Sequence, residues 1–253
     1  MCGVDHGGRA RQRGMDVHGC FRYRSEGTRG SPTGRTCRAV GRVITAAAGV
    51  APGEEGNTFI GSAGLEQLSI FADFSAPETY GFLGRLTFTQ LGAVGLSVVT
   101  STELTISRTK AHINRHPMGS AIITLVLDGV CRVVQGRHQV IADAGQLLVR
   151  LSDTPYAMTM QDNTTLVEVS IPLPIGSPKD LNDLLAFSVP DSEVSLRIDR
   201  QLLNLSTVQP TPGSAEALAA ERTLLDLSAR LVAEIGGAAT KVHRQQVNRT
   251  GRV

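Results

Sequence analysis

Histidines in the middle of the chain are the first candidates for metal chemistry. His112 and His116 are spaced HINRH, which would put them on the same face of a strand or loop, and His138 stands alone. An ion held by three imidazoles and a carboxylate needs a His-x-His pair, a following Glu and a later His. The sequence has no His-x-His pair and no Glu at the required place, and after the isolated His138 no further His occurs before His243. We therefore expect no bound metal.

A nucleophile is not expected either. Cys131 lies between Val130 and Arg132 in an apolar run, where a cysteine is usually a small hydrophobic core residue. The other cysteines lie within the first 37 residues and form no Cys-x-x-Cys pair, and no Gly-x-Ser-x-Gly elbow occurs. These observations predict no catalytic residues, no cofactor and a non-enzymatic protein.

Four polar residues in apolar runs are candidate contacts for a small ligand. Arg108 shares a strand face with Leu104 and Ile106, so it either points inward, where it would clamp a carboxylate, or lies at the wet end of its strand. Tyr156 either offers its hydroxyl to a pocket or caps the fold. Thr124 and Arg132 complete the set of candidates.

Short β-type runs, separated by turn residues, must position these side chains. The predicted strands are 86–91, 94–100, 104–113, 121–127, 130–135, 138–142, 147–151, 156–160 and 166–171. Their spacing of roughly 8–12 residues predicts an all-β sandwich or barrel.

Turn residues separate the predicted strands. Asp128-Gly129 between two apolar runs predicts a hairpin. Further turns are expected at Gly136-Arg137 and at Asp143-Ala144-Gly145, where Gly145 supplies the positive φ. Asp153 is expected to order its turn by binding backbone amides, beside Pro155.

Helical signals follow the strands. Ser177-Pro178 opens a short helix that runs through Phe187, and a second helix extends from near Ser214 to Gly236-Gly237. The second helix carries an apolar stripe that packs either on the barrel or against a partner as a dimer seam. The stripe consists of Leu224, Leu227, Leu231 and Ile235.

The ends of the chain differ from its middle. Residues 1–42 contain nine Arg and no Lys, although the whole chain has a formal net charge of only +2. We expect residues 1–57 to be a disordered tail, which is either a nucleic-acid-binding arm, a simply solvated segment or the product of a start codon placed too far upstream. Residues 238–253 are expected to be a second disordered tail. No signal peptide or membrane span is apparent, which indicates a cytoplasmic protein with reduced thiols.

Residues 81–172 resemble the N-terminal, AraC-binding-like domain of AraC/XylS-type transcription regulators. The resemblance rests on the order of FLGRLTFTQLGAVGLSVV, ISRT with Arg108, the run ITLVLDGVCRVVQGRHQVIADAGQLLVRLSDTPYAM, and Ile171-Pro172. It departs from the family at Ala144 and Gln146, where Pro and Asp are usual, and keeps Gly145.

The resemblance implies a mainly β, cupin-like barrel or jelly roll over residues 58–175 that senses a small-molecule effector. It further implies a helical dimerisation segment over residues 176–237. The family's paired helix-turn-helix units have no counterpart in the 16 residues after Gly237, so we expect no sequence-specific DNA binding by this chain, which would act as a homodimer or with a full-length relative. The alternative is a small cupin-type metalloenzyme, an isomerase or a dioxygenase.

Overall fold

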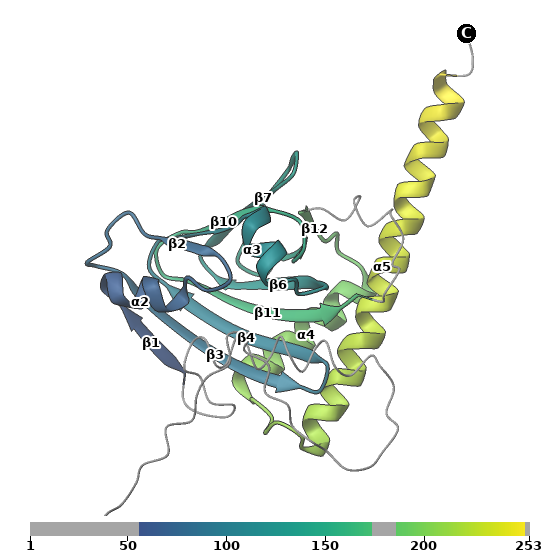
Figure 1. Ribbon diagram of the computed structural model, residues 1–253. Coiled ribbons are helices and arrows are strands. Elements are labelled where there is room, and N and C mark those ends of the chain that lie inside the picture. The colour runs from purple at the N-terminus through teal and green to yellow at the C-terminus, as the bar shows by residue number, and fades with distance from the viewer. Residues whose placement is uncertain (1–55, 174–185, 251–253) are drawn as a thin grey trace, which may run out of the picture. The chain divides into compact units, whose positions relative to one another are not determined.

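The computed structural model describes residues 56–173 and 186–250, with side chains described up to Ile235 in the last helix. In this part of the chain the strands form two antiparallel sheets (Figure 1). The seven-stranded sheet has the order β1 (Asn57–Ile60), β3 (Leu83–Leu91), β4 (Val94–Ser101), β11 (Thr164–Pro172), β6 (Ser120–Asp128), β9 (Leu147–Leu151) and β12 (Phe187–Ser188). The five-stranded sheet has the order β2 (Asp73–Ser75), β5 (Leu104–Arg108), β10 (Tyr156–Met160), β7 (Val130–Gln135) and β8 (His138–Asp143).

An inner core lies where side chains of both sheets meet. Period-2 alternation turns every second residue of a strand to the same face, and this brings Leu148 and Leu166 of the seven-stranded sheet together with Val133 of the five-stranded sheet. Helix α2 (Gly61–Leu68) contributes Leu65 to the same core. The inner face of this barrel also contains the cavity described below.

An outer core forms on the opposite face of the seven-stranded sheet, where helices α4 (Glu193–Thr207) and α5 (Ala215–Thr250) pack. Ser192 caps α4 by accepting from the Ser195 amide, while the Ser195 hydroxyl accepts from the Ser192 amide. Ile198 and Leu202 of α4 are fully buried against the sheet and α5. The seven-stranded sheet is therefore apolar on both faces.

The predicted dimer stripe lies in this outer core. Leu224, Leu227 and Leu231 are at most 3% exposed, and the partly buried Ile235 packs against the same cluster. Of the two interpretations of the stripe, packing within the chain is the one observed. These side chains are already covered by the sheet and α4, so the assignment of the stripe as a dimer seam was wrong.

Most predicted strands are confirmed to within a few residues. The predicted strand 104–113 is too long: it ends at Arg108, because Thr109 caps the short helix α3 (Lys110–Arg115) by accepting from the His112 amide. Asp128-Gly129 does turn the chain, yet it forms no hairpin. Strand β6 pairs with β11 and β9, whereas β7 pairs with β8 and β10, so this turn carries the chain from one sheet to the other.

The helical segment also departs from expectation. The helix predicted to begin at Ser177 falls mostly outside the described residues, and its last residue, Phe187, belongs to strand β12. Helix α4 was missed. Helix α5 continues past Gly236-Gly237, because a helix interior tolerates a glycine at a cost of about 1 kcal/mol when no proline follows. Residues 238–250 are thus helical.

The predicted N-terminal tail lies outside the described residues, except that Gly56 is described and Asn57 begins β1. Within the described residues, no helix combines the length and the apolar composition that a membrane span requires.

Candidate ligand-binding site

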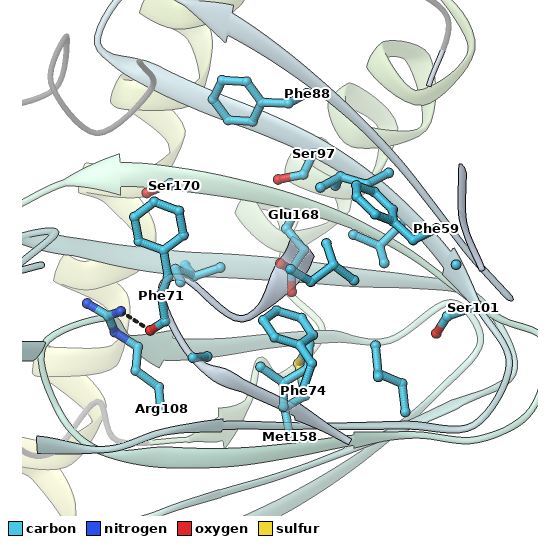
Figure 2. Close-up of a pocket in the computed structure, with 18 of the residues that line it drawn as sticks. Phe59, Phe71, Phe74, Phe88, Ser97, Ser101, Arg108, Met158, Glu168 and Ser170 are labelled. Atoms are coloured by element: carbon cyan, nitrogen blue, oxygen red, sulfur yellow. Dashed lines mark hydrogen bonds between the residues drawn. The ribbon is translucent and has the colours of Figure 1, made fainter. Parts of the chain in front are cut away.

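A cavity of about 180 Å³ lies inside the barrel (Figure 2). Strands β1, β3, β4, β6, β9 and β11 line it from one sheet and β2, β5 and β10 from the other, and α2 contributes Gln67 and Leu68. The exposed Gln67 and Arg85 mark its rim. Its walls are mostly apolar and rich in phenylalanine, with Phe59, Phe71, Phe74, Phe82 and Phe88 among the lining residues.

Arg108, the leading sequence candidate, lines this cavity and is 2% exposed. Its Nε donates to the Ser152 carbonyl at 2.8 Å, and its two terminal nitrogens donate to the carbonyls of Phe71 at 2.7 Å (dashed in Figure 2) and His116 at 2.6 Å. The Asp153 carboxylate lies 3.9 Å away. Burial lowers the pKa of Arg108, which Tyr156 and Asp153 partly oppose. Arg108 therefore ties three loops to the barrel wall.

A buried ion pair on the opposite wall was missed from the sequence. Arg150 of β9 donates from one terminal nitrogen to Glu168 Oε1 of β11 at 2.8 Å and from the other to the Thr124 hydroxyl at 2.7 Å. The Thr124 hydroxyl in turn donates to Glu168 Oε1 at 2.9 Å. Arg150 and Glu168 both line the cavity, and Figure 2 shows the Glu168 carboxylate between Ser97 and the Phe74 ring. This triad joins three neighbouring strands.

The electrostatics of Arg150 follow from this arrangement. Burial is the largest single effect and lowers its pKa, but the charge of Glu168, the hydrogen bond to Glu168, and the nearby Tyr156 and Cys131 together outweigh burial and raise the pKa. Arg150 is therefore a cation in the barrel interior, 2% exposed. Among the described residues, its Nε has no hydrogen-bond partner. A buried donor without an acceptor costs about 1–3 kcal/mol, and more when it is charged.

The four sequence candidates thus separate into three groups. Arg108 and Tyr156 line the cavity on adjacent strands, where they face each other in register, and the Tyr156 ring lies 5.1 Å from the Arg150 guanidinium carbon. Thr124 is fully buried and contacts the cavity only through the triad. Arg132 is exposed on the outside of the barrel, where it donates to Gln139 at 2.8 Å.

The predicted turn residues occupy turns. Gly129 and Gly145 have φ of +79° and +82°, the left-handed region that favours glycine. Asp153 binds two backbone amides, those of Met118 and Gly119, each at 2.8 Å. These amides belong to the segment before β6 and not to Asp153's own turn, so the carboxylate links two loops. Pro155 is exposed immediately before β10.

The histidine and cysteine candidates take structural positions. His112 Nδ1 bonds to the hydroxyl of Thr109, the residue that caps α3, and His112 Nε2 lies 3.5 Å from the Asp73 carboxylate. The ring of His116 packs edge-on against Phe71. Cys131 is fully buried, and burial raises its pKa to about 12. In the part of the chain that the structure describes, no three His, Cys, Asp or Glu residues lie together as metal ligands.

A sequence signal for the missed pair does exist. Arg150 is the only charged residue of the run LLVRL, and Glu168 is the only one of TTLVEVSIP. Two opposite charges in otherwise apolar strands indicate a buried pair, because an unpaired charge is rarely buried.

Comparisons with known proteins place this geometry in a family. A family model described as an AraC-binding-like domain matches residues 72–249, and no curated protein matches the chain. The solved structure of the AraC-like transcriptional activator CuxR superposes with a TM-score of 0.58 at 16% identity, covering 67% of this chain and 64% of that chain.

Other solved structures match less of the chain. EutQ of Clostridium difficile matches at a TM-score of 0.30 and 17% identity, over 36% of this chain and 69% of that chain. A cupin superfamily protein from Desulfitobacterium hafniense DCB-2 matches at a TM-score of 0.31 and 12% identity, over 39% of this chain and 84% of that chain. The predicted mainly β fold with a helical appendage is confirmed.

Proposed function

The chain belongs to the family of AraC-binding-like domains, and on this premise we propose that it is the effector-sensing module of a cytoplasmic transcription regulator. The effector is a small molecule that occupies the cavity between the two sheets, and the module performs no reaction on it. One observation carries the proposal: the cavity is apolar, yet it contains a buried arginine whose Nε has no acceptor among the described residues. A bound molecule would supply that acceptor.

Sensing also needs a route from the cavity to the helices, and strands β3 and β4 provide one. Phe88 and Ser97 line the cavity from these strands, and the turn that joins the strands contacts α5, where Glu221 accepts from the Ala93 amide. Gln209, in the connection between α4 and α5, bonds to Thr87 at 3.0 Å. An effector that binds one position of this hairpin more tightly would shift the position of α5.

A cavity-filling variant tests the proposal. In Ser97→Phe the new ring enters the cavity, whereas in Thr100→Phe the same ring lies on an exposed position of the same strand. In a thermal-shift screen of a small-molecule library, we expect compounds that raise the melting temperature of the wild-type chain and of Thr100→Phe but not of Ser97→Phe. If every stabilising compound also stabilises Ser97→Phe, the cavity is not the effector site.

Dimerisation, as a homodimer or with a full-length relative, is part of the same proposal. Because the stripe is buried, a dimer must use other residues of the helix pair. The exposed apolar side chains there are Leu196 and Leu203 of α4 and Leu218 and Val232 of α5. We expect a dimer at micromolar concentration by light scattering, which Leu218→Glu weakens; a monomer would contradict this part of the proposal. In this proposal the described helices α4 and α5 serve dimerisation and not DNA recognition.

A further inference from the structure

We propose that the effector is an uncharged molecule of about one six-membered ring that carries a carbonyl oxygen, and that this oxygen binds Nε of Arg150. The inference rests on the proposed function and specifies the ligand class. Size, hydrogen bonding and charge each support it separately.

The size of the cavity limits the ligand. An engineered apolar cavity of about 150 Å³ holds benzene, and the cavity here measures about 180 Å³. It therefore accepts one ring and a small substituent. Because the walls are mostly apolar and aromatic, they favour a flat, apolar ligand such as an aromatic ring.

The Arg150 guanidinium limits the polar group. Its two terminal nitrogens bond to Thr124 and Glu168, whose oxygens are themselves bonded to each other. Thr124 and Glu168 thus lie along the edge that the two terminal nitrogens form, and the edge that carries Nε is left without a partner among the described residues. An arginine N–H donates and never accepts. The ligand must therefore present an acceptor, and a carbonyl oxygen next to the ring does so without adding bulk.

The surrounding charges argue for an uncharged ligand. Arg150 is already neutralised by Glu168 at 2.8 Å, and Arg108 donates to three carbonyls with Asp153 at 3.9 Å. A ligand carboxylate on Arg150 would lie close to the Glu168 carboxylate in apolar surroundings. Like charges that are desolvated together repel each other strongly, and the loss of water around the anion adds a further cost.

Three probes of nearly the same shape test this inference. Acetophenone carries a carbonyl, isopropylbenzene replaces it with an apolar branch, and benzoate replaces it with a carboxylate. In calorimetric titrations of the full chain, we expect acetophenone to bind about 10- to 100-fold more tightly than isopropylbenzene, the range for one hydrogen bond to a charged donor. Benzoate is expected to bind more weakly than acetophenone.

A double variant assigns the preference to Arg150. In Arg150→Met/Glu168→Leu both charges are removed together, so that neither is left buried alone. We expect isopropylbenzene to bind this variant about as well as the wild-type chain, with the advantage of acetophenone reduced to about threefold or less. An advantage that persists in the variant would overturn the role of Arg150.

The remaining outcomes separate this inference from the proposed function. If benzoate binds most tightly, or if isopropylbenzene binds as well as acetophenone, and Ser97→Phe abolishes that binding, the ligand class is wrong while the sensing cavity stands. If none of the probes binds, the ligand class is again wrong, and the library screen decides whether the cavity binds any effector.

Discussion

The buried pair of Arg150 and Glu168 yields the sharpest stability prediction. The perturbation is a cycle of three variants: Glu168→Leu, Arg150→Met and the two combined. Each single variant leaves one buried charge without its counter-ion, and the double variant leaves none. The effect on the free energy of unfolding should therefore be far from additive.

The magnitude follows from the burial and the contacts of the pair. The side chains of Arg150 and Glu168 are 3% and 14% exposed and 2.8 Å apart, and removal of one partner of such a pair costs about 3–5 kcal/mol. For a domain of this size, roughly 2–4 °C of melting temperature corresponds to each kcal/mol, so either single variant should melt roughly 6–20 °C lower. Replacement of both partners by apolar residues should restore stability to within about 1 kcal/mol of the wild-type chain.

The assay is urea unfolding followed by circular dichroism, with all variants compared at the same pH. The matched control is Asp226→Leu, because Asp226 forms an ion pair with Arg230 of similar length, 3.0 Å, on the exposed surface of α5. That change should alter the unfolding free energy by less than about 0.5 kcal/mol. If the double variant of the buried pair loses the sum of the two single losses, the two charges are not coupled and the reasoning is refuted.

Three further predictions concern the neighbouring groups. Arg108→Met leaves the carbonyls of Phe71, His116 and Ser152 without their donor, so it should lower the unfolding free energy by more than about 3 kcal/mol. Arg108→Lys should lose a similar amount. A loss below about 1 kcal/mol in urea unfolding would contradict this. Burial, together with nearby positive charges, lowers the pKa of His116, so the unfolded chain binds more protons than the folded chain near pH 6. The free energy of unfolding should therefore fall as the pH drops below about 6.5, and it should fall less in His116→Phe. An equal pH dependence of the wild-type chain and the variant in urea unfolding would contradict this. Burial raises the pKa of Cys131 to about 12, so with the other cysteines replaced by serine the native chain should not react with a thiol reagent at pH 8 until it unfolds; rapid labelling of the folded chain would show that the thiol is accessible.

The inner and outer faces of the barrel could not be assigned from the strand patterns. In AIITLVL and LLVRL apolar residues follow one another, because the inner core and the outer core bury both faces of the seven-stranded sheet. Arg108 alternates with Leu104 and Ile106, and of the two positions that this pattern left open, the inward one is observed. Arg132 has the same kind of neighbours, yet its strand lies in the five-stranded sheet and turns it to solvent.

The sequence by itself determined the local structure of the barrel. Alternation, β-branched residues and glycine turns define the order of β3 to β11 and place their bounds to within a few residues, except for the end of β5, because these preferences act over a few neighbouring residues. Only the tertiary structure decided which strands pair across the Asp128-Gly129 turn, that the stripe of α5 faces the sheet, and that Arg150 and Glu168 meet. These outcomes depend on contacts between residues that are distant in the chain. Alternative contacts compete for the same buried surface, and the choice between them is made only when all elements pack together.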